Sequence, residues 1–183
     1  MCIDNEIPFG IPESWVWVRL KSVFDVRDGT HDTPKYVDKG IPLVTSKNLK
    51  FNGIDFNAAK LISDRDFSII SLRSGVSEGD VLFAMIGTIG NPVIVTSGLQ
   101  KFAIKNMALF KQYKSNICNI NYFYYFLLLE QTKMKNLATG GVQSFVSLDF
   151  LRKYLYPFPP IKEQERIIQK TDLLFGCLQL LKN

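Results

Sequence analysis

The last part of the chain restricts the fold most, because residues 161–182 contain no proline and repeat apolar side chains along one face. These apolar positions are separated by seven, four and three residues: Ile167, Leu174, Leu178 and Leu181. The spacing predicts an amphipathic helix of about 33 Å. Pro160 suits its first turn, where a missing amide hydrogen loses no bond, and Glu163 and Glu165 suit the positive end of the helix dipole.

An apolar stripe of this kind needs a surface to pack against, and the sequence leaves two alternatives open. In one, the stripe pairs with another helix, so that two copies of the chain form a symmetric antiparallel dimer. In the other, the helix folds back onto its own domain. The Pro159-Pro160 pair marks a boundary in both cases. We therefore expect a globular domain over residues 1–158 and a helix over residues 159–183.

The globular part has the mixed pattern of an α+β domain. Proline and glycine interrupt the chain often between residues 12 and 56, which predicts loops and short strands. Beyond this stretch, short β-branched and apolar runs predict strands of a mixed β-sheet at residues 81–86, 93–96 and 103–113. Residues 155–158 predict a further strand at an edge.

Three helices are predicted within the same domain. Ser63 is a suitable N-cap for a helix that ends at Ser71, and Ser147 is suitable for one that ends at Lys153. Residues 122–137 have the length and composition of a largely buried helix. The longest apolar run, residues 122–129, is far shorter than the roughly twenty residues that a membrane span needs.

The charge balance is compatible with a polyanionic partner without requiring one. Lys and Arg number 22 against 17 Asp and Glu, so the formal net charge is +5. A mild basic excess suits nucleic acid, but many proteins without such a partner carry a similar charge. Motifs therefore have to decide the function.

The cysteine and histidine content argues against a disulfide framework and a zinc site. Cys2, Cys118 and Cys177 are far apart, and His31 is the only histidine. The N-terminal segment contains Asp4 and Glu6 and lacks a signal-peptide pattern, so we expect a cytoplasmic protein that does not contact a membrane. We predict no metal site, no cofactor and no catalytic residue.

Four segments, in this order and spacing, form a recognisable set. They are Ile11-Pro12-Glu13-Ser14-Trp15 with Arg19-Leu20, Asp28-Gly29-Thr30-His31-Asp32-Thr33-Pro34, Gly79-Asp80-Val81-Leu82 with Gly87-Thr88-Ile89-Gly90, and Leu155-Tyr156-Pro157-Phe158-Pro159-Pro160-Ile161-Lys162-Glu163-Gln164-Glu165-Arg166-Ile167. With these segments the chain resembles one target-recognition half of the specificity subunit of type I restriction-modification enzymes. The last segment is the most specific of the four.

The resemblance implies a domain that recognises a short sequence of double-stranded DNA, followed by a spacer helix. It also implies three kinds of protein partner: a modification subunit that methylates adenine with S-adenosylmethionine, a restriction subunit, and a second recognition half. That second half, or a second copy of this chain, would pair with the C-terminal helix through Ile167, Leu174, Leu178 and Leu181. The chemistry belongs to the other subunits, which agrees with the lack of a methyltransferase, P-loop or H-E-x-x-H motif here.

Polar and basic loop residues are the candidates for DNA contact, because amides pair with adenine and Lys or Arg with guanine or phosphate. The candidates are Thr30, His31, Lys35, Ser46, Lys47, Asn48, Thr88, Lys105, Asn106, Gln143 and Ser144. We expect the stretch 45–48 to form an exposed loop. Together with the loop at 140–144 it is the strongest candidate for a contact.

Two other interpretations of these motifs compete with duplex recognition. His31 lies near Asp25, Asp28 and Asp32 and could act as a general base, but strong turn formers surround it and no nucleophile motif accompanies it. The Gly87 to Gly90 spacing resembles the clamp by which KH domains hold single-stranded nucleic acid. A non-enzymatic module for RNA or single strands is therefore the alternative function.

Overall fold

The computed structural model describes residues 3–51, 53–114, 116–138 and 145–180 of the 183-residue chain. The helices of this part are α1 (Asp64–Ser74), α2 (Ile120–Asn136), α3 (Leu148–Lys153) and α4 (Ile161–Leu180). The strands are β1 (Val16–Arg19), β2 (Phe24–Asp28), β3 (Tyr36–Val37), β4 (Ile41–Val44), β5 (Leu49–Lys50), β6 (Gly53–Ile54), β7 (Lys60–Ile62), β8 (Val81–Ala84), β9 (Gly90–Ile94), β10 (Ala103–Ile104), β11 (Met107–Gln112) and β12 (Leu155–Phe158). None of these helices is long and apolar enough to cross a membrane.

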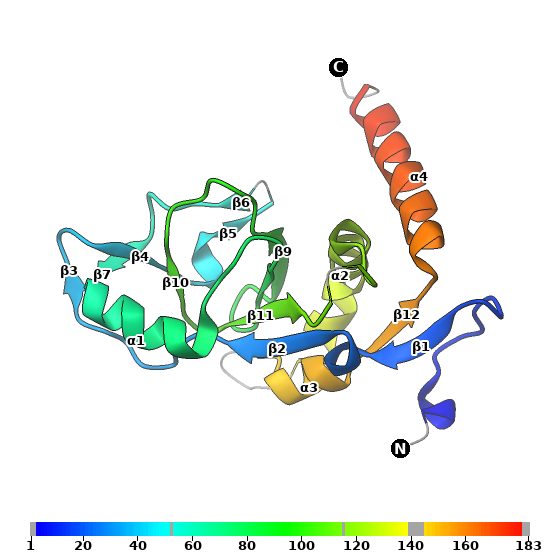
Figure 1. The fold of residues 1–183 in the computed structure, drawn as a ribbon, viewed down its shortest axis with the longest axis horizontal. Helices are drawn as coiled ribbons and strands as arrows, with labels where there is room; N and C mark the ends of the chain where they lie inside the picture. The colour runs from blue at the N-terminus through cyan, green and yellow to red at the C-terminus, as the bar shows by residue number, and fades with distance from the viewer. Residues whose placement is uncertain (1–2, 52, 115, 139–144, 181–183) are drawn as a thin grey trace.

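The strands form two four-stranded sheets and two two-stranded sheets: β5 with β6, which are adjacent in sequence, and β1 with β12, which come from opposite ends of the domain (Figure 1). The first larger sheet is antiparallel, with the order β2-β11-β8-β9, and the second has the order β10-β4-β7-β3. The second sheet is mixed, because β10 runs parallel to β4 while the other pairs are antiparallel. The expected α+β class with a mixed sheet is therefore confirmed, although the strands are distributed over several sheets.

The backbone at Asn106 explains why one expected strand became two. Residues 103–113 predict a continuous strand, but Asn106 has a φ of 53°, which lies in the left-handed region and cannot continue a β-strand. The chain changes direction at this residue, so β10 pairs with β4 in the mixed sheet and β11 with β2 and β8 in the antiparallel sheet. Two residues, Lys105 and Asn106, thus connect the two larger sheets.

Aromatic side chains fill the main core between the antiparallel sheet and the helices. Phe24 of β2 stacks on Phe123 of α2 with ring centroids 4.0 Å apart, and Phe110 of β11 contacts Phe123 edge to face. Tyr156 of β12 closes the cluster and is fully buried. Aromatic pairs of this kind add to the stabilisation from burial. The core holds α2 and β12 against the sheet.

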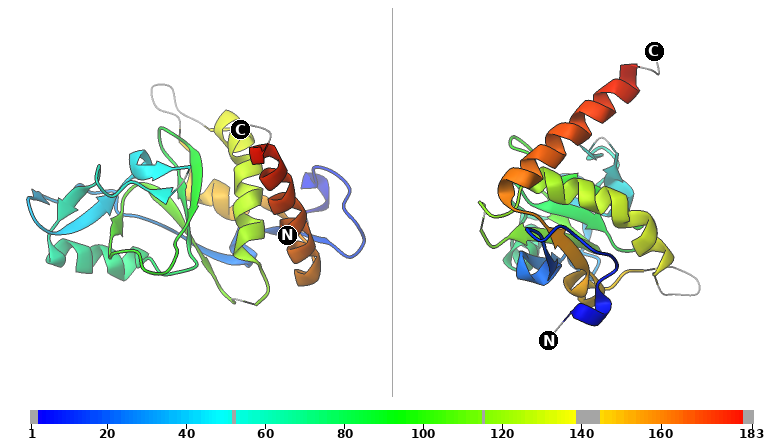
Figure 2. Two further views of the ribbon diagram at one scale, coloured as in Figure 1. Left: turned by 90° about the horizontal axis from the view of Figure 1, so that it is seen from above. Right: turned by 90° about the vertical axis from the view of Figure 1, so that its right-hand side faces the viewer.

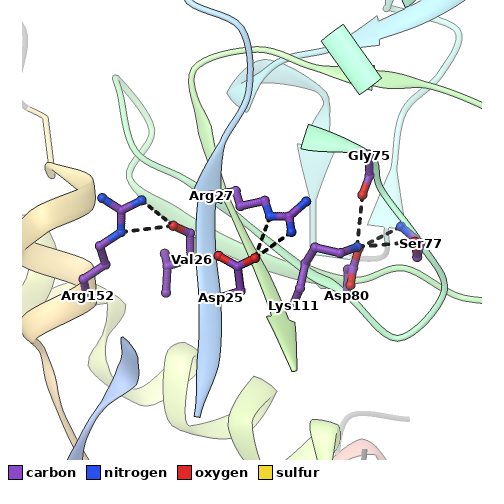
Figure 3. A network of polar contacts seen from close by, with 8 residues as sticks. All are labelled: Asp25, Val26, Arg27, Gly75, Ser77, Asp80, Lys111 and Arg152. Carbon is purple, nitrogen blue, oxygen red and sulfur yellow. Dashed lines mark hydrogen bonds and ion pairs between the residues drawn. The ribbon is translucent and has the colours of Figure 1, made fainter. Parts of the chain in front are cut away.

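The helix starts predicted at Ser63 and Ser147 are confirmed, because each rests on a local hydrogen bond, whereas α2 begins two residues earlier than expected, at Ile120. The Ser63 hydroxyl accepts from the amide of Asp66 at the start of α1, and the Ser147 hydroxyl accepts from the amide of Phe150 at the start of α3. α1 ends three residues later than expected, at Ser74. On α3, Arg152 donates to the carbonyl of Val26 in β2 at 2.7 Å, which ties the helix to the sheet (Figure 3).

The long C-terminal helix α4 is anchored at its start and again at Asp172 and Phe175, which both contact Tyr125 of α2. The buried Gln164 accepts from the amide of Asn119 at 2.7 Å and donates to the carbonyl of Pro159 at 2.9 Å. Ile168 is buried beside it, and the C-terminal part of α4 projects from the end of the domain that lies away from β3 and β7 (Figure 1). In a second view, α4 lies beside α2 (Figure 2).

This anchoring divides the predicted apolar stripe. Ile167 is half-buried and packs against the core of its own domain, so this part of the predicted stripe has an intramolecular partner. Its position is explained by its neighbour Ile168 and by Gln164 one turn earlier, which dock this turn of the helix. Leu174 and Leu178 remain 63% and 54% exposed, as a pairing face requires. Leu181 lies outside the described residues.

A buried ion pair holds one end of the antiparallel sheet. Asp80, just before β8, lies 2.5 Å from the ammonium of Lys111 on β11, which also donates to the carbonyl of Gly75 (Figure 3). Burial raises the pKa of the Asp80 carboxyl, although Lys111 and the amide of Ser77 both favour its charged form. The pair therefore links β8 to β11 at one end of the sheet, opposite the end where Ala84 pairs with Met107.

Candidate nucleic-acid interface

Several segments leave the antiparallel sheet at the same end of its strands. β2 ends at Asp28 and β8 ends at Ala84, while β11 begins at Met107, and the strand register sets Ala108 opposite Asp28 and Met107 opposite Ala84. The segments that continue beyond these strand ends therefore emerge together. We call residues 29–31, 44–47, 85–88 and 104–106 the polar edge; the segment 44–47 joins it through the mixed sheet.

The mixed sheet supplies that fourth segment through the parallel pairing of β10 with β4. The amide of Lys105 donates to the carbonyl of Val44 at 2.9 Å, so Ser46 and Lys47 follow directly beyond the point of pairing. On the other side of Lys105, Thr30 forms a parallel bridge and its amide donates to the carbonyl of Ile104 at 3.0 Å. Three segments that are distant in sequence thus run side by side.

Gly29 is required for this close approach. A Cβ atom at this position would lie 2.3 Å from the carbonyl oxygen of Ile104, which is far inside van der Waals contact with backbone that cannot move freely. The glycine of the Asp28-Gly29-Thr30-His31 motif therefore lets the chain press against residues 104–106. The motif's role in the fold is to bring the following residues, Thr30 and His31, into the polar edge.

A buried carboxylate organises the side chains around His31. Asp28 is only 5% exposed and accepts hydrogen bonds from Nε2 of His31 at 2.6 Å and from Nη2 of Arg73 at 2.5 Å. The other ring nitrogen of His31 lies 3.0 Å from Oδ1 of Asn106. The His31 side chain is nevertheless 56% exposed, so its ring is held in a fixed position at the surface. No cluster of metal-ligating side chains occurs in the described part of the chain.

The side chain of Asn48 is buried within the 45–48 stretch, contrary to expectation. Residues Ser46–Asn48 form a short 3-10 turn, and the Asn48 carboxamide accepts from the amide and hydroxyl of Thr45 and donates to the carbonyl of Asp55 at 3.1 Å. Asn48 is 3% exposed, so the expectation that the whole stretch is exposed is wrong. The polarity of Asn48 serves this internal cap. Its neighbour Lys47 is exposed and remains a candidate for DNA contact.

The remaining predicted residues lie at different distances from this arrangement. Thr88 is exposed in the turn between β8 and β9, within the polar edge. The ammonium of Lys105 donates to the hydroxyl of Thr33, which follows His31 by two residues. Lys35 is exposed but lies outside the four segments, immediately before β3. Gln143 and Ser144 fall outside the described residues.

Arg73 was missed by reasoning from the sequence. It lies in the last turn of α1, where a basic residue is ordinarily explained by the helix dipole. Its contact with Asp28 joins residues 45 positions apart and depends on how α1 packs over the sheet. The sequence contains no local signal for such a pair. In the structure Arg73 adds a half-exposed cation beside His31.

Comparison with known proteins gives consistent results across sequence and structure. The family model described as type I restriction modification DNA specificity domain matches residues 12–183. The specificity subunit of the type I restriction enzyme EcoAI from Escherichia coli is 27% identical over 193 aligned positions, which cover 98% of this chain and 31% of that protein.

Two solved structures share the fold. The HsdS subunit from Thermoanaerobacter tengcongensis aligns with a TM-score of 0.68 at 18% identity, over 96% of this chain and 41% of that one. A chain from a structure on complex assembly and conformational transition of the type I R-M system aligns with a TM-score of 0.71 at 18% identity, over 96% and 42%. This chain thus spans less than half the length of the proteins it is similar to.

The internal cap of the 45–48 turn leads to a stability prediction. Replacing Asn48 with Ala leaves the partly buried Thr45 amide and Asp55 carbonyl without their partner, which costs about 1–3 kcal/mol. Replacing the exposed Lys47 with Ala is the matched control and changes the free energy of unfolding by less than about 0.5 kcal/mol. Urea denaturation followed by circular dichroism measures both. Equal unfolding midpoints for the two variants would contradict the role assigned to Asn48.

Proposed function

This chain belongs to the type I restriction-modification DNA specificity family, and from that membership we propose that it binds duplex DNA and recognises a short sequence within it. The observation that carries the proposal is the polar edge, where Gly29 lets Thr30 and His31 lie against Lys105 and Asn106. Amide, hydroxyl and basic side chains at one edge are the groups that contact bases and phosphates.

The rigidity of the polar edge supports sequence reading over loose attraction to phosphate. Backbone bonds join Thr30 to Ile104 and Asn106, and the buried Asp28 orients both His31 and Arg73. Side chains that are fixed in this way present hydrogen-bonding groups in a defined geometry, which base recognition requires. Charge alone would attract DNA without regard to its sequence.

The structure favours duplex over single-stranded nucleic acid. The clamp of a KH domain joins two helices, whereas here the residues from Gly87 to Gly90 connect strands β8 and β9. Single-strand binding also uses exposed aromatic rings as stacking platforms; here the largest aromatic group is buried in the core, while Tyr36 and Phe51 are exposed singly. The alternative module for RNA or single strands therefore lacks the helix-flanked clamp among the described residues.

We assign residues 1–158 to recognition and residues 159–183 to pairing with a second recognition half or a second copy of the chain. The anchor at Gln164 and Ile168 supports a fixed direction for α4, and the exposed Leu174 and Leu178 support a pairing face beyond it. Two domains joined in this way would read a two-part site. Leu181, also predicted for this face, lies outside the described residues.

The proposed role is recognition without catalysis. Methyl transfer and cleavage would be performed by modification and restriction subunits, which the bound chain directs to its site. His31 and Asp28 are close enough for proton transfer. The Asp28 carboxylate also accepts from Arg73, however, and we assign it the role of orienting these two surface side chains. No cofactor is needed for that role.

Salt dependence tests the proposal on one residue. Replacing Lys105 with Ala is expected to weaken duplex binding and to lower the slope of log affinity against log salt by about 0.9, because one phosphate contact is lost. Replacing Lys162 with Ala removes the same charge from the exposed start of α4 and is expected to leave the slope unchanged. Fluorescence anisotropy at several salt concentrations measures both. Identical slopes for the two variants would contradict an interface at the polar edge.

Pairing through α4 is tested separately. Replacing both Leu174 and Leu178 with Asp is expected to abolish a dimer that wild type forms at high concentration, because it places charges in the apolar contact. Replacing Leu72 with Asp, on the exposed face of α1, is the control and leaves the dimer intact. Light scattering at increasing concentration reports the mass. A wild type that stays monomeric would overturn the homodimer.

A further inference from the structure

The imidazole of His31 lies between two side-chain oxygen atoms. Its Nε2 is 2.6 Å from Oδ2 of Asp28, and its Nδ1 is 3.0 Å from Oδ1 of Asn106. The Asp28 carboxylate is buried and is held from its other side by Arg73, so it cannot turn away from the ring. Both hydrogen-bonding positions of the ring are therefore engaged while the ring itself stays exposed to solvent.

The carboxylate determines which ring nitrogen carries a proton. An ionised carboxylate only accepts hydrogen bonds, so Nε2 of His31 has to donate to Asp28 in every protonation state of the ring. The variable position is Nδ1, which donates when the ring is positively charged and accepts when the ring is neutral. Protonation of His31 therefore changes whether Nδ1 donates to or accepts from the side chain of Asn106.

The carboxamide of Asn106 has to rotate so that its oxygen faces a protonated Nδ1 and its amino group faces a neutral one. When Nδ1 carries a proton it donates to Oδ1, and the Asn106 amino group is left free. When Nδ1 is neutral, the Asn106 amino group has to donate to it, and Oδ1 is left free. The backbone of Asn106 is held by its bond to the carbonyl of Thr30 at 3.2 Å, so rotation of the carboxamide is the available response.

We propose that Asn106 contacts a base in the bound DNA and that the protonation of His31 selects which end of its carboxamide faces that base. A free amino group suits an acceptor, such as N7 or O6 of guanine, whereas a free oxygen suits the amino group of adenine or cytosine. This inference rests on the proposed function. It makes one chain capable of different base preferences under different conditions.

The surroundings of the ring contain charges of both signs. Asp28 on β2 is the anion, while Arg73 on α1 and Lys105 beside Asn106 are cations. The experiments therefore compare about pH 5.5 with about pH 8, which bracket the range in which histidine side chains ordinarily change charge. Ionic strength has to be equal at both pH values, because the charge of His31 also changes general attraction to phosphate.

Nuclear magnetic resonance of the full chain without DNA tests the mechanism directly. The side-chain amide signals of Asn106 are expected to shift with pH, with the same midpoint as the ring signals of His31. Replacing His31 with Gln removes the titrating group and is expected to remove the shift. Asn106 signals that do not follow the His31 titration would overturn the inference while leaving the proposed DNA binding in place.

Selection of duplexes from a random pool tests the consequence for recognition. Wild type is expected to change its preference about tenfold at one base position between the two pH values. Replacing Asn106 with Gly, which removes the carboxamide and tolerates a φ of 53°, removes that change, whereas replacing the exposed Lys162 with Ala, on α4 outside the polar edge, retains it. Equal preferences at both pH values, or a change that persists without Asn106, would overturn the inference. A pool with no enriched sequence would overturn the proposed function and this inference with it.

Discussion

The left-handed turn of the backbone at Asn106 is the constraint on which the arrangement of the site depends. It ends β10 in the mixed sheet and starts β11 in the antiparallel sheet, so the two sheets meet at residues 104–106. Thr30 and Val44 then pair with this junction from its two sides, and Gly29 permits the approach of the first. The proposed interface is a consequence of how the two sheets are joined.

Stability and recognition are carried by different parts of the molecule. The aromatic core around Phe24, Phe123 and Tyr156 binds α2 and β12 to the sheet, and the pair of Asp80 and Lys111 links β8 to β11 at the opposite end. Within the polar edge, Val44, Met85 and Ile104 contribute to the core, while Lys47 and Thr88 of the same segments are exposed. The same separation applies to α4, whose first turns dock on the domain while its later turns expose leucines.

Much of the fold could be predicted from the sequence because its signals are local. The caps at Ser63 and Ser147 and the C-terminal helix each depend on residues within a few positions, and all three are confirmed. Contacts between distant residues were not predictable in the same way. A continuous strand pattern at 103–113 conceals the turn at Asn106, and the polarity of Asn48 predicts exposure although its side chain caps its own loop. The contact of Arg73 with Asp28 exists only after α1 has packed.

The central claim is that the polar edge is the DNA-binding surface, and amide hydrogen exchange with and without a selected duplex tests it most directly. The account predicts slower exchange in the bound state for peptides that contain residues 29–31, 44–47, 85–88 and 104–106. It predicts no change around Ser77 and Asp80, at the opposite end of the antiparallel sheet. Protection confined to that opposite end, with unchanged exchange along the polar edge, would contradict the account.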